Sequence, residues 1–192
     1  IYPNDFIPVF EKNGFIVNID MYVLETVCKF IYYWINKGYR IVPISVNLSR
    51  IHISTPNLVK NICEIVDKYN IPRSYIELEL TESTDYDDMQ QLIEVLKNLH
   101  NEGFLIAMDD FGKAYSSLNL LKEIPIDILK LDKDFITSCA GNSKGETIIK
   151  LILSMSKKLG LEVVCEGVET KVQVDFLTNI GCDVAQGYYF SK

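Results

Sequence analysis

Six short apolar runs in this chain each end in a polar or charged residue, and patterns typical of amphipathic helices separate them. Successive runs begin 21 to 34 residues apart, which is the size of a strand–helix unit. The runs begin near Ile41, Tyr75, Phe104, Asp127, Leu161 and Cys182. Regular alternation of this kind predicts a parallel sheet covered by helices. The polar residues would then gather at the carboxyl ends of the strands, where ligands bind in such folds.

Two folds satisfy this alternation, an open doubly wound sheet and a (β/α)8 barrel of the TIM type. No glycine-rich phosphate loop follows the first run, which argues against a dinucleotide-binding open sheet. A complete barrel needs about 250 residues, whereas the chain has 192 and about six visible βα units. If the fold is the barrel, about two strands are missing. We expect them upstream of Ile1, because the chain opens on Ile rather than Met.

Charge and composition exclude several classes of function. The net charge of −7 and pI of about 4.9 argue against DNA binding through a basic surface. Five cysteines without a CxxC pair indicate a reducing compartment and no disulfide framework. His52 and His100, expected on loop and helix surfaces, are too few for a histidine-rich zinc site. No apolar run approaches the ~20 residues of a membrane span, so we expect no membrane contact from this segment.

The amphipathic patterns also predict helix starts and buried faces. Thr55 followed by Pro56 is expected to cap one helix. In the second apolar run, Glu77 and Glu79 are odd-numbered positions and Glu82 is even-numbered, so strand alternation places them on the opposite face from Glu82. We expect Glu77 and Glu79 to be solvated or salt-bridged. A later helix is expected to bury a face made of Ile148, Leu151, Ile152, Met155 and Leu159.

Lys130 is the most unusual polar residue because it lies inside an apolar run. Strand alternation places it on the same face as Ile128 and Asp132. A lone lysine in a strand is ordinarily a snorkelling or edge-strand side chain. The neighbouring Asp132 and the alignment with other strand-end polar groups make a functional role an equal alternative.

Two adjacent aspartates, Asp109 and Asp110, end the third apolar run. A single aspartate after a strand commonly caps the next helix or turn. Two in succession are harder to explain in that way. Adjacent carboxylates at a strand end can bind two divalent ions, which activate water and clamp a phosphate. We therefore interpret this pair as candidate metal ligands.

The other strand-end residues have both structural and functional interpretations. Asn47 ends the first run, Glu82 ends the second, and Glu166 and Glu169 follow the fifth. Alone, each has an ordinary role at a turn or in the first turn of a helix. Together with the two aspartates they form an oxygen-rich set, which suits Mg²⁺ or Mn²⁺. The residues alone therefore predict a metal-dependent hydrolase or lyase.

Seven segments follow one another along nearly the whole chain: Pro3 to Ile16, Val46-Asn47-Leu48-Ser49, Leu80-Thr81-Glu82-Ser83, Asp109-Asp110-Phe111-Gly112, Leu129-Lys130-Leu131-Asp132, Glu166-Gly167-Val168-Glu169 and Gln186-Gly187-Tyr188. In this order they resemble the EAL domain, a bacterial family of cyclic di-GMP phosphodiesterases. Each is weak alone, whereas seven in the family's order are specific. The chain is identified as a member of this family, with residues 1–192 forming a single EAL-type domain that is incomplete at its N-terminus.

The resemblance implies a modified (β/α)8 barrel with one antiparallel strand. It implies hydrolysis of cyclic di-GMP to the linear dinucleotide, which lowers a bacterial second messenger. Two Mg²⁺ or Mn²⁺ ions would be held by Asn47, Glu82, Asp109, Asp110 and Glu166. Catalysis would involve Lys130 and Glu166, and the substrate would be contacted by Gln186, Glu169 and Asp132. An acidic chain can then bind an anionic substrate, because the bound cations reverse the local charge.

The chain departs from the family pattern in three places. The Glu-Ala-Leu signature itself, with a metal-binding glutamate and a nearby substrate-binding arginine, belongs upstream of Ile1. In the loop after the aspartates, Lys113 adds a charge and Ala114 replaces a glycine. Asp85 stands where the family often has a glutamate that braces this loop. These changes spare the ligand residues but motivate a second hypothesis, a catalytically impaired receptor that binds cyclic di-GMP without cleaving it. A third is a protein-docking module that has lost both activities.

The resemblance also carries expectations about the surroundings of the domain. EAL domains often dimerise, and they are often attached to sensor or diguanylate cyclase modules in longer proteins. Together with the cysteine pattern, this predicts a location in the bacterial cytoplasm, alone or as the cytoplasmic part of a larger protein.

Overall fold

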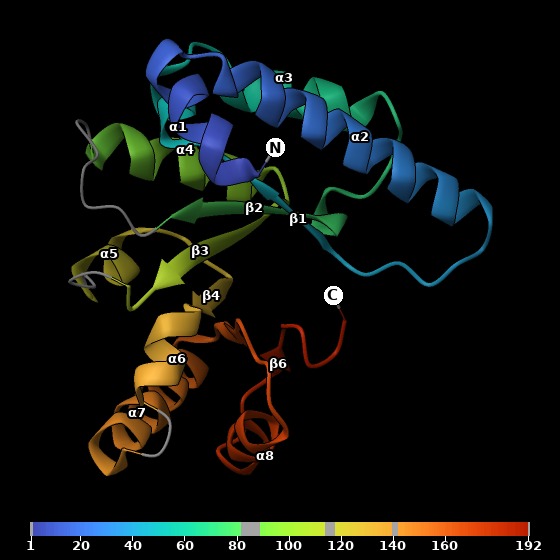
Figure 1. Ribbon diagram of the computed structural model, residues 1–192. Coiled ribbons are helices and arrows are strands. Elements are labelled where there is room, and N and C mark those ends of the chain that lie inside the picture. Colours follow the sequence, from blue (N-terminus) through green and yellow to red (C-terminus); the bar gives the residue numbers. More distant parts are fainter. Residues whose placement is uncertain (1, 82–88, 114–117, 140–141, 192) are drawn as a thin grey trace. The chain divides into compact units, whose positions relative to one another are not determined.

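The computed structural model describes residues 2–81, 89–113, 118–139 and 142–191 (Figure 1). The chain divides into two compact units, residues 1–106 with 123–125, and residues 107–122 with 126–192. The first unit contains α1 (Pro3–Asn13), α2 (Ile16–Asn36), β1 (Ile44–Asn47), α3 (Leu58–Asp67), β2 (Ile76–Thr81) and α4 (Met89–Asn101). From β3 (Leu105–Phe111) the chain continues through α5 (Leu118–Glu123), β4 (Ile128–Leu131), α6 (Lys133–Cys139), α7 (Ser143–Leu159), β5 (Glu162–Cys165), α8 (Lys171–Asn179) and β6 (Val184–Ala185).

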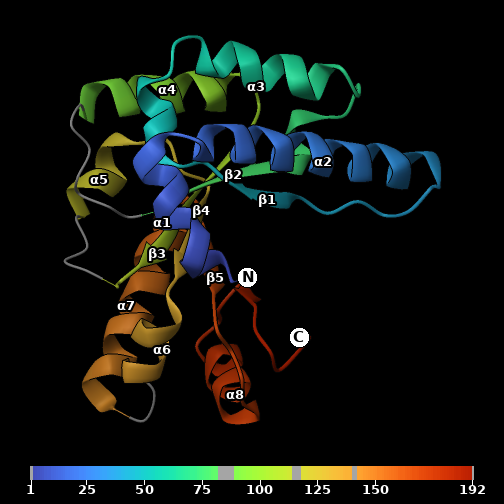
Figure 2. The ribbon, with the colours of Figure 1, turned by 45° about the horizontal axis from the view of Figure 1, so that its top comes forward.

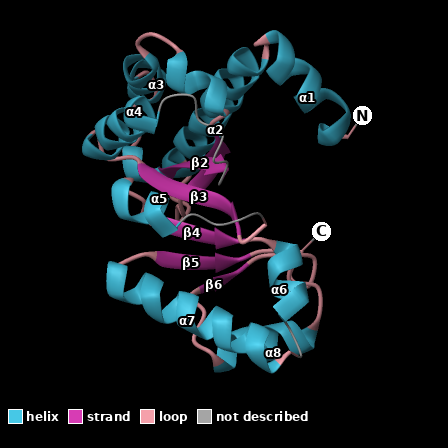
Figure 3. Ribbon diagram, turned by 90° about the vertical axis from the view of Figure 1, so that its left-hand side faces the viewer, coloured by secondary structure: helices cyan, strands magenta, loops and turns pink. Residues whose placement is uncertain are grey.

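All six expected strands are present, and the pairs within each unit are parallel. In the first unit β1 pairs with β2, with Val46 opposite Leu78. In the second unit β3, β4, β5 and β6 pair in chain order, and Figure 3 shows β4, β5 and β6 side by side. The predicted alternation of parallel strands and helices is therefore confirmed.

Helices bury the apolar side of the first unit. In α2, Leu24, Cys28 and Ile31 are buried. Helix α2 packs against β1 and α3, and Figure 2 shows α3 and α4 side by side.

Among the described residues no helix is long and apolar enough to cross a membrane.

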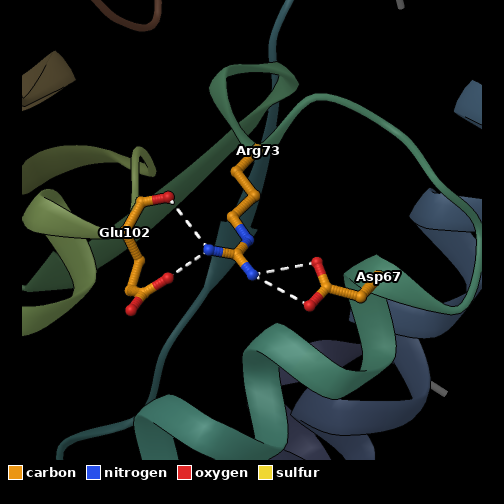
Figure 4. Close-up of polar contacts among 3 residues, drawn as sticks. All are labelled: Asp67, Arg73 and Glu102. Atoms are coloured by element: carbon orange, nitrogen blue, oxygen red, sulfur yellow. Dashed lines mark hydrogen bonds and ion pairs between the residues drawn. The ribbon is translucent and has the colours of Figure 1, made fainter.

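Arg73 ties together the ends of two helices in this unit (Figure 4). Its Nη2 donates to both carboxylate oxygens of Asp67, the last residue of α3, at 2.9 Å each. Its Nη1 donates to the backbone carbonyl of Glu102, at 3.2 Å, and to the Glu102 carboxylate. One guanidinium thereby fixes the turn that leads into β2.

Two local expectations are wrong. Helix α3 begins at Leu58 after Asn57, which has a φ of 60°, so Thr55 does not cap it. Instead Thr55 closes a short 3₁₀ turn through its backbone N–H, which donates to the His52 carbonyl. The cap was misplaced because that intervening turn leaves no periodic signal in the sequence.

Helix α7 buries a different face from the expected one. Ile149 and Leu153 are buried with Gly145, whereas Ile148 and Leu151 are 47% and 64% exposed. A Cβ on Gly145 would lie 2.5 Å from the Cα of Cys139, at the end of α6. Because α6 and α7 approach closely at Gly145, the face of α7 that carries this glycine is the buried one.

Candidate active site

Lys130 lies in the interior of the parallel sheet of the second unit. Strand β4 is paired with β3 on one side and β5 on the other, so the edge-strand interpretation of this lysine is wrong. The Lys130 side chain is only 7% exposed, and its Nζ lies 2.6 Å from Glu166 Oε1. Glu166 follows β5 directly, and its backbone N–H donates to the Leu131 carbonyl at 3.0 Å. Two neighbouring strand ends thus place a buried cation against a carboxylate.

The two aspartates form a bulge in β3 opposite this lysine. Met108 is paired with Leu129, and Phe111 is paired with Leu131, so two residues of β3 oppose the single residue Lys130. A bulge of this kind re-aims side chains and is common beside active sites.

The bulge explains why Asp109 and Asp110 remain inside β3 instead of ending it. Asp110 has a φ of 58°, in the left-handed region that aspartate tolerates better than most residues. Its backbone N–H donates to Asp109 Oδ1 at 2.8 Å. The two aspartates are both half-buried.

Lys113 is bonded to the second aspartate. Its Nζ donates to Asp110 Oδ2 at 3.2 Å, and the two side chains are 58% and 33% exposed. The pKa of the Lys113 ammonium is raised above its usual value, chiefly by this hydrogen bond. The extra charge expected from the sequence therefore lies directly on a candidate metal ligand. Ala114, the other change in this loop, lies outside the described residues, as does Asp85.

Gly167 allows the chain to turn sharply after Glu166. It has a φ of 64°, and a Cβ there would lie 2.3 Å from the Cβ of Lys133. A side chain at this position would be strained by its backbone conformation and would collide with α6. The glycine thus keeps Glu166 close to the ends of β4 and β5.

The three predicted substrate-contacting residues occupy the same ends of the strands. Asp132 is buried and caps α6, because its Oδ1 accepts from Asp134 N at 2.8 Å and Phe135 N at 3.3 Å. Gln186 is exposed after β6, and its backbone N–H donates to the Cys165 carbonyl at 2.9 Å.

Glu169, the third of these residues, is already paired. Its carboxylate accepts from Lys133 Nζ at 2.6 Å, and this ion pair raises the pKa of the Lys133 ammonium. No local pattern in the sequence marks this ion pair, because 36 positions separate the two residues.

The other two predicted ligands, Asn47 and Glu82, do not belong to the described residues of the second unit. Asn47 ends β1 in the first unit and is exposed, and Glu82 lies outside the described residues. The loop after Asn47 is anchored by Asp20 of α2, whose Oδ2 accepts from Ser49 N and contacts His52 Nε2, both at 3.0 Å. His52 is fully buried, so its expected place on a loop surface is wrong.

Glu77 and Glu79 are also buried, at 8% and 5% exposure, so of the two alternatives expected for them, solvated or salt-bridged, the solvated one is wrong. Glu77 Oε1 accepts from Ser45 Oγ at 2.9 Å, across the β1–β2 pair. Parallel strands are commonly covered on both faces. The parallel topology, which the sequence did predict, was therefore the signal that both faces of β2 would be enclosed.

The donor chemistry of the strand ends suits a hard divalent ion. Within the second unit Asp109, Asp110 and Glu166 offer carboxylate oxygens, the ligand type that Mg²⁺ and Mn²⁺ prefer. Among the described residues, a set that leaves out Glu82, no three His, Cys, Asp or Glu side chains are gathered closely enough to form a metal site.

The sequence model of the family described as "EAL domain" matches residues 1–192. The chain belongs to the EAL domain family. It is 37% identical over 190 residues to the signaling protein YkoW of Bacillus subtilis, covering 99% of this chain and 24% of YkoW. It is 36% identical over 192 residues to the bifunctional diguanylate cyclase/cyclic di-GMP phosphodiesterase MucR of Pseudomonas aeruginosa, covering all of this chain and 28% of MucR.

Comparison with a solved EAL structure confirms the fold class. The PaMucR phosphodiesterase in its c-di-GMP complex superposes with a TM-score of 0.91 at 36% identity, covering all of this chain and 78% of that one. The chain thus has the (β/α) barrel-type architecture of the family. It spans only about a quarter of the length of the curated relatives named above.

Proposed function

We propose that residues 1–192 are a single EAL-type phosphodiesterase domain that hydrolyses cyclic di-GMP to the linear dinucleotide. One observation carries the proposal: a buried lysine, paired with Glu166, lies opposite a bulge that presents Asp109 and Asp110. MucR, which is 36% identical, is described as a cyclic di-GMP phosphodiesterase and has been solved with c-di-GMP. The seven segments that resemble the family's motifs, in the family's order, support the same chemistry for this chain.

In this proposal Asp109, Asp110 and Glu166, with Asn47 and Glu82, are the residues that would hold two Mg²⁺ or Mn²⁺ ions. When bound, such ions supply Lewis-acid activation of water and neutralise the phosphate. The donor set supports this assignment, since every member offers oxygen. A direct test is metal titration by calorimetry, in which Asp109→Asn should weaken binding at least tenfold. Unchanged binding in that variant would refute the assignment.

Lys130 is proposed as the cationic catalytic residue. Its ammonium is held in place by Glu166 and shielded from solvent, so it needs little reorganisation as negative charge grows on the phosphate oxygens. Charge–charge interactions in such a water-poor position are stronger than at the surface. Lys130 would also orient the attacking water by hydrogen bonding.

Gln186, Glu169 and Asp132 are proposed to contact the substrate. Asp132 does so while its Oδ1 caps α6, which fixes the orientation of the carboxylate. Glu169 would exchange or share its ion pair with Lys133 when the substrate binds. An exposed ion pair of this kind is weak enough to be exchanged.

A cyclic di-GMP receptor without turnover is the second candidate, because one observation favours it. Lys113 Nζ already bonds Asp110 Oδ2, and a positive charge there opposes the binding of a metal ion. Chromatography after incubation with cyclic di-GMP and Mn²⁺ distinguishes the two functions. Linear dinucleotide that disappears on chelation supports the enzyme, whereas calorimetric binding without product supports the receptor.

We also propose that the domain works in the bacterial cytoplasm as part of a longer signalling protein, together with sensor or diguanylate cyclase modules, and as a homodimer. The combination of cyclase and phosphodiesterase in the description of MucR supports the first part. Light scattering on the purified full-length protein tests the second part, and a mass equal to one chain at all concentrations would contradict it.

A further inference from the structure

Two cysteines in the second unit lie in direct contact beside the candidate active site. Cys165 is the last residue of β5, and Cys182 lies between α8 and β6. Their Sγ atoms are 3.2 Å apart. A disulfide bond is about 2.05 Å long, so a movement of about 1.2 Å joins the two sulfur atoms.

The surroundings of the pair distinguish an accessible sulfur atom from a protected one. Cys165 is fully buried, whereas Cys182 is half-buried and reachable from solvent. Contact with Cys165 lowers the pKa of the Cys182 thiol, because a hydrogen bond from the Cys165 thiol stabilises the Cys182 thiolate. The thiolate is the reactive form of cysteine. Oxidants should therefore react with Cys182 before Cys165.

We propose that Cys165 and Cys182 form a reversible oxidation site for hydroperoxides. The Cys182 sulfur attacks a peroxide oxygen; the S–O bond forms, the O–O bond breaks, and water leaves after protonation. The Cys165 sulfur then attacks the Cys182 sulfur; the S–S bond forms, the S–O bond breaks, and a second water leaves. Two thiols and one hydrogen peroxide thus give one disulfide and two waters. Transient disulfides of this kind are compatible with a reducing compartment.

The site is coupled to the candidate active site through the backbone. The Cys165 carbonyl accepts from Gln186 N at 2.9 Å, and Glu166 is the next residue along the chain. A bond from Cys165 to Cys182 closes a loop that contains α8 and ties the end of β5 to the start of β6. Oxidation therefore restrains the two segments that carry Glu166 and Gln186.

Peptide mapping of the full-length protein tests the proposal. The reduced protein is treated with a small excess of hydrogen peroxide, the remaining thiols are alkylated, and the protein is digested with trypsin. Cleavage after Lys171 separates the two cysteines into peptides 159–171 and 172–192. We expect the linked pair of peptides to form at low peroxide, to disappear on reduction, and to be absent from Cys182→Ser.

Cys63→Ser is the matched control, because Cys63 is also half-buried but lies in α3 of the first unit. It should form the linked peptides as the wild type does. Oxidation of Cys182 to sulfinic acid without a linked peptide would overturn the proposal, and so would thiols that stay unchanged at both positions.

Hydrogen exchange supplies a second measurement that does not depend on catalysis. The Gln186 amide should exchange at least several-fold more slowly in the oxidised Cys63→Ser protein than in the reduced one, because its acceptor is fixed by the cross-link. An equal exchange rate in the two states would overturn the coupling to the candidate active site.

Discussion

Removing Lys113 should increase the affinity of the candidate active site for its metal ions. Lys113 Nζ lies 3.2 Å from Asp110 Oδ2 and must give up this contact when a divalent ion binds the same carboxylate. The Lys113 side chain is 58% exposed and that of Asp110 is 33% exposed, so solvent screens the pair. Exposed ion pairs contribute about 0.2–1 kcal/mol. Lys113→Ala should therefore tighten metal binding by about 1.4- to 5-fold.

The assay is calorimetric titration of the full-length protein with Mn²⁺ at low salt. Lys171→Ala is the matched control, since Lys171 forms a similarly exposed ion pair with Asp175 within α8. The control should bind Mn²⁺ as the wild type does. The increase in Mn²⁺ affinity caused by Lys113→Ala should become smaller as salt is added, because salt screens exposed charges.

Equal Mn²⁺ affinity in the wild type and in Lys113→Ala would refute this reasoning. It would show that Lys113 leaves Asp110 without cost, or that Asp110 does not hold the metal. Asp110→Asn separates these cases, because it weakens Mn²⁺ binding only if Asp110 is a ligand.

Three further predictions concern other parts of the chain. Lys130→Met should lower the turnover of cyclic di-GMP by about a hundredfold or more while calorimetric affinity stays within a few-fold; turnover near the wild-type rate would exclude the proposed role. Gly145→Ala should cost about 1–3 kcal/mol of stability in urea unfolding, because the new methyl group meets the Cys139 backbone; unchanged stability would show that α6 and α7 separate freely. Hydrogen bonds from Lys68 and Tyr69 lower the pKa of Glu25 to about 2 from 4.5, so its stabilisation is present above pH 4.5 and lost as the pH falls towards 2. Glu25→Gln should therefore lose less stability than the wild type over that interval, and identical acid profiles would contradict this cause.

The strands could be predicted because each carries a local signal. An apolar run ending in a polar residue was enough to locate β1 to β6 within a few residues. Lys130 and Glu166 also stood out locally, since each interrupts or ends such a run. Their 2.6 Å contact follows from the parallel register of β4 and β5, in which Leu131 is opposite Cys165.

The features that were missed depend on contacts between distant residues. The Asp20–His52 pair joins side chains 32 positions apart, and no local pattern marks a buried histidine. The bulge at Asp109 and Asp110 arises from pairing with β4, so alternation along β3 alone could not reveal it. The buried face of α7 was set by its packing against α6, which overrode the most apolar stripe of the helix.

The most direct test of the account is the initial rate of linear dinucleotide formation as a function of Mn²⁺ concentration. The full-length protein is incubated with cyclic di-GMP, and product is followed by chromatography. The rate should rise to saturation with Mn²⁺ and fall to zero after chelation. Folded protein that binds cyclic di-GMP yet forms no product at any Mn²⁺ concentration would contradict it.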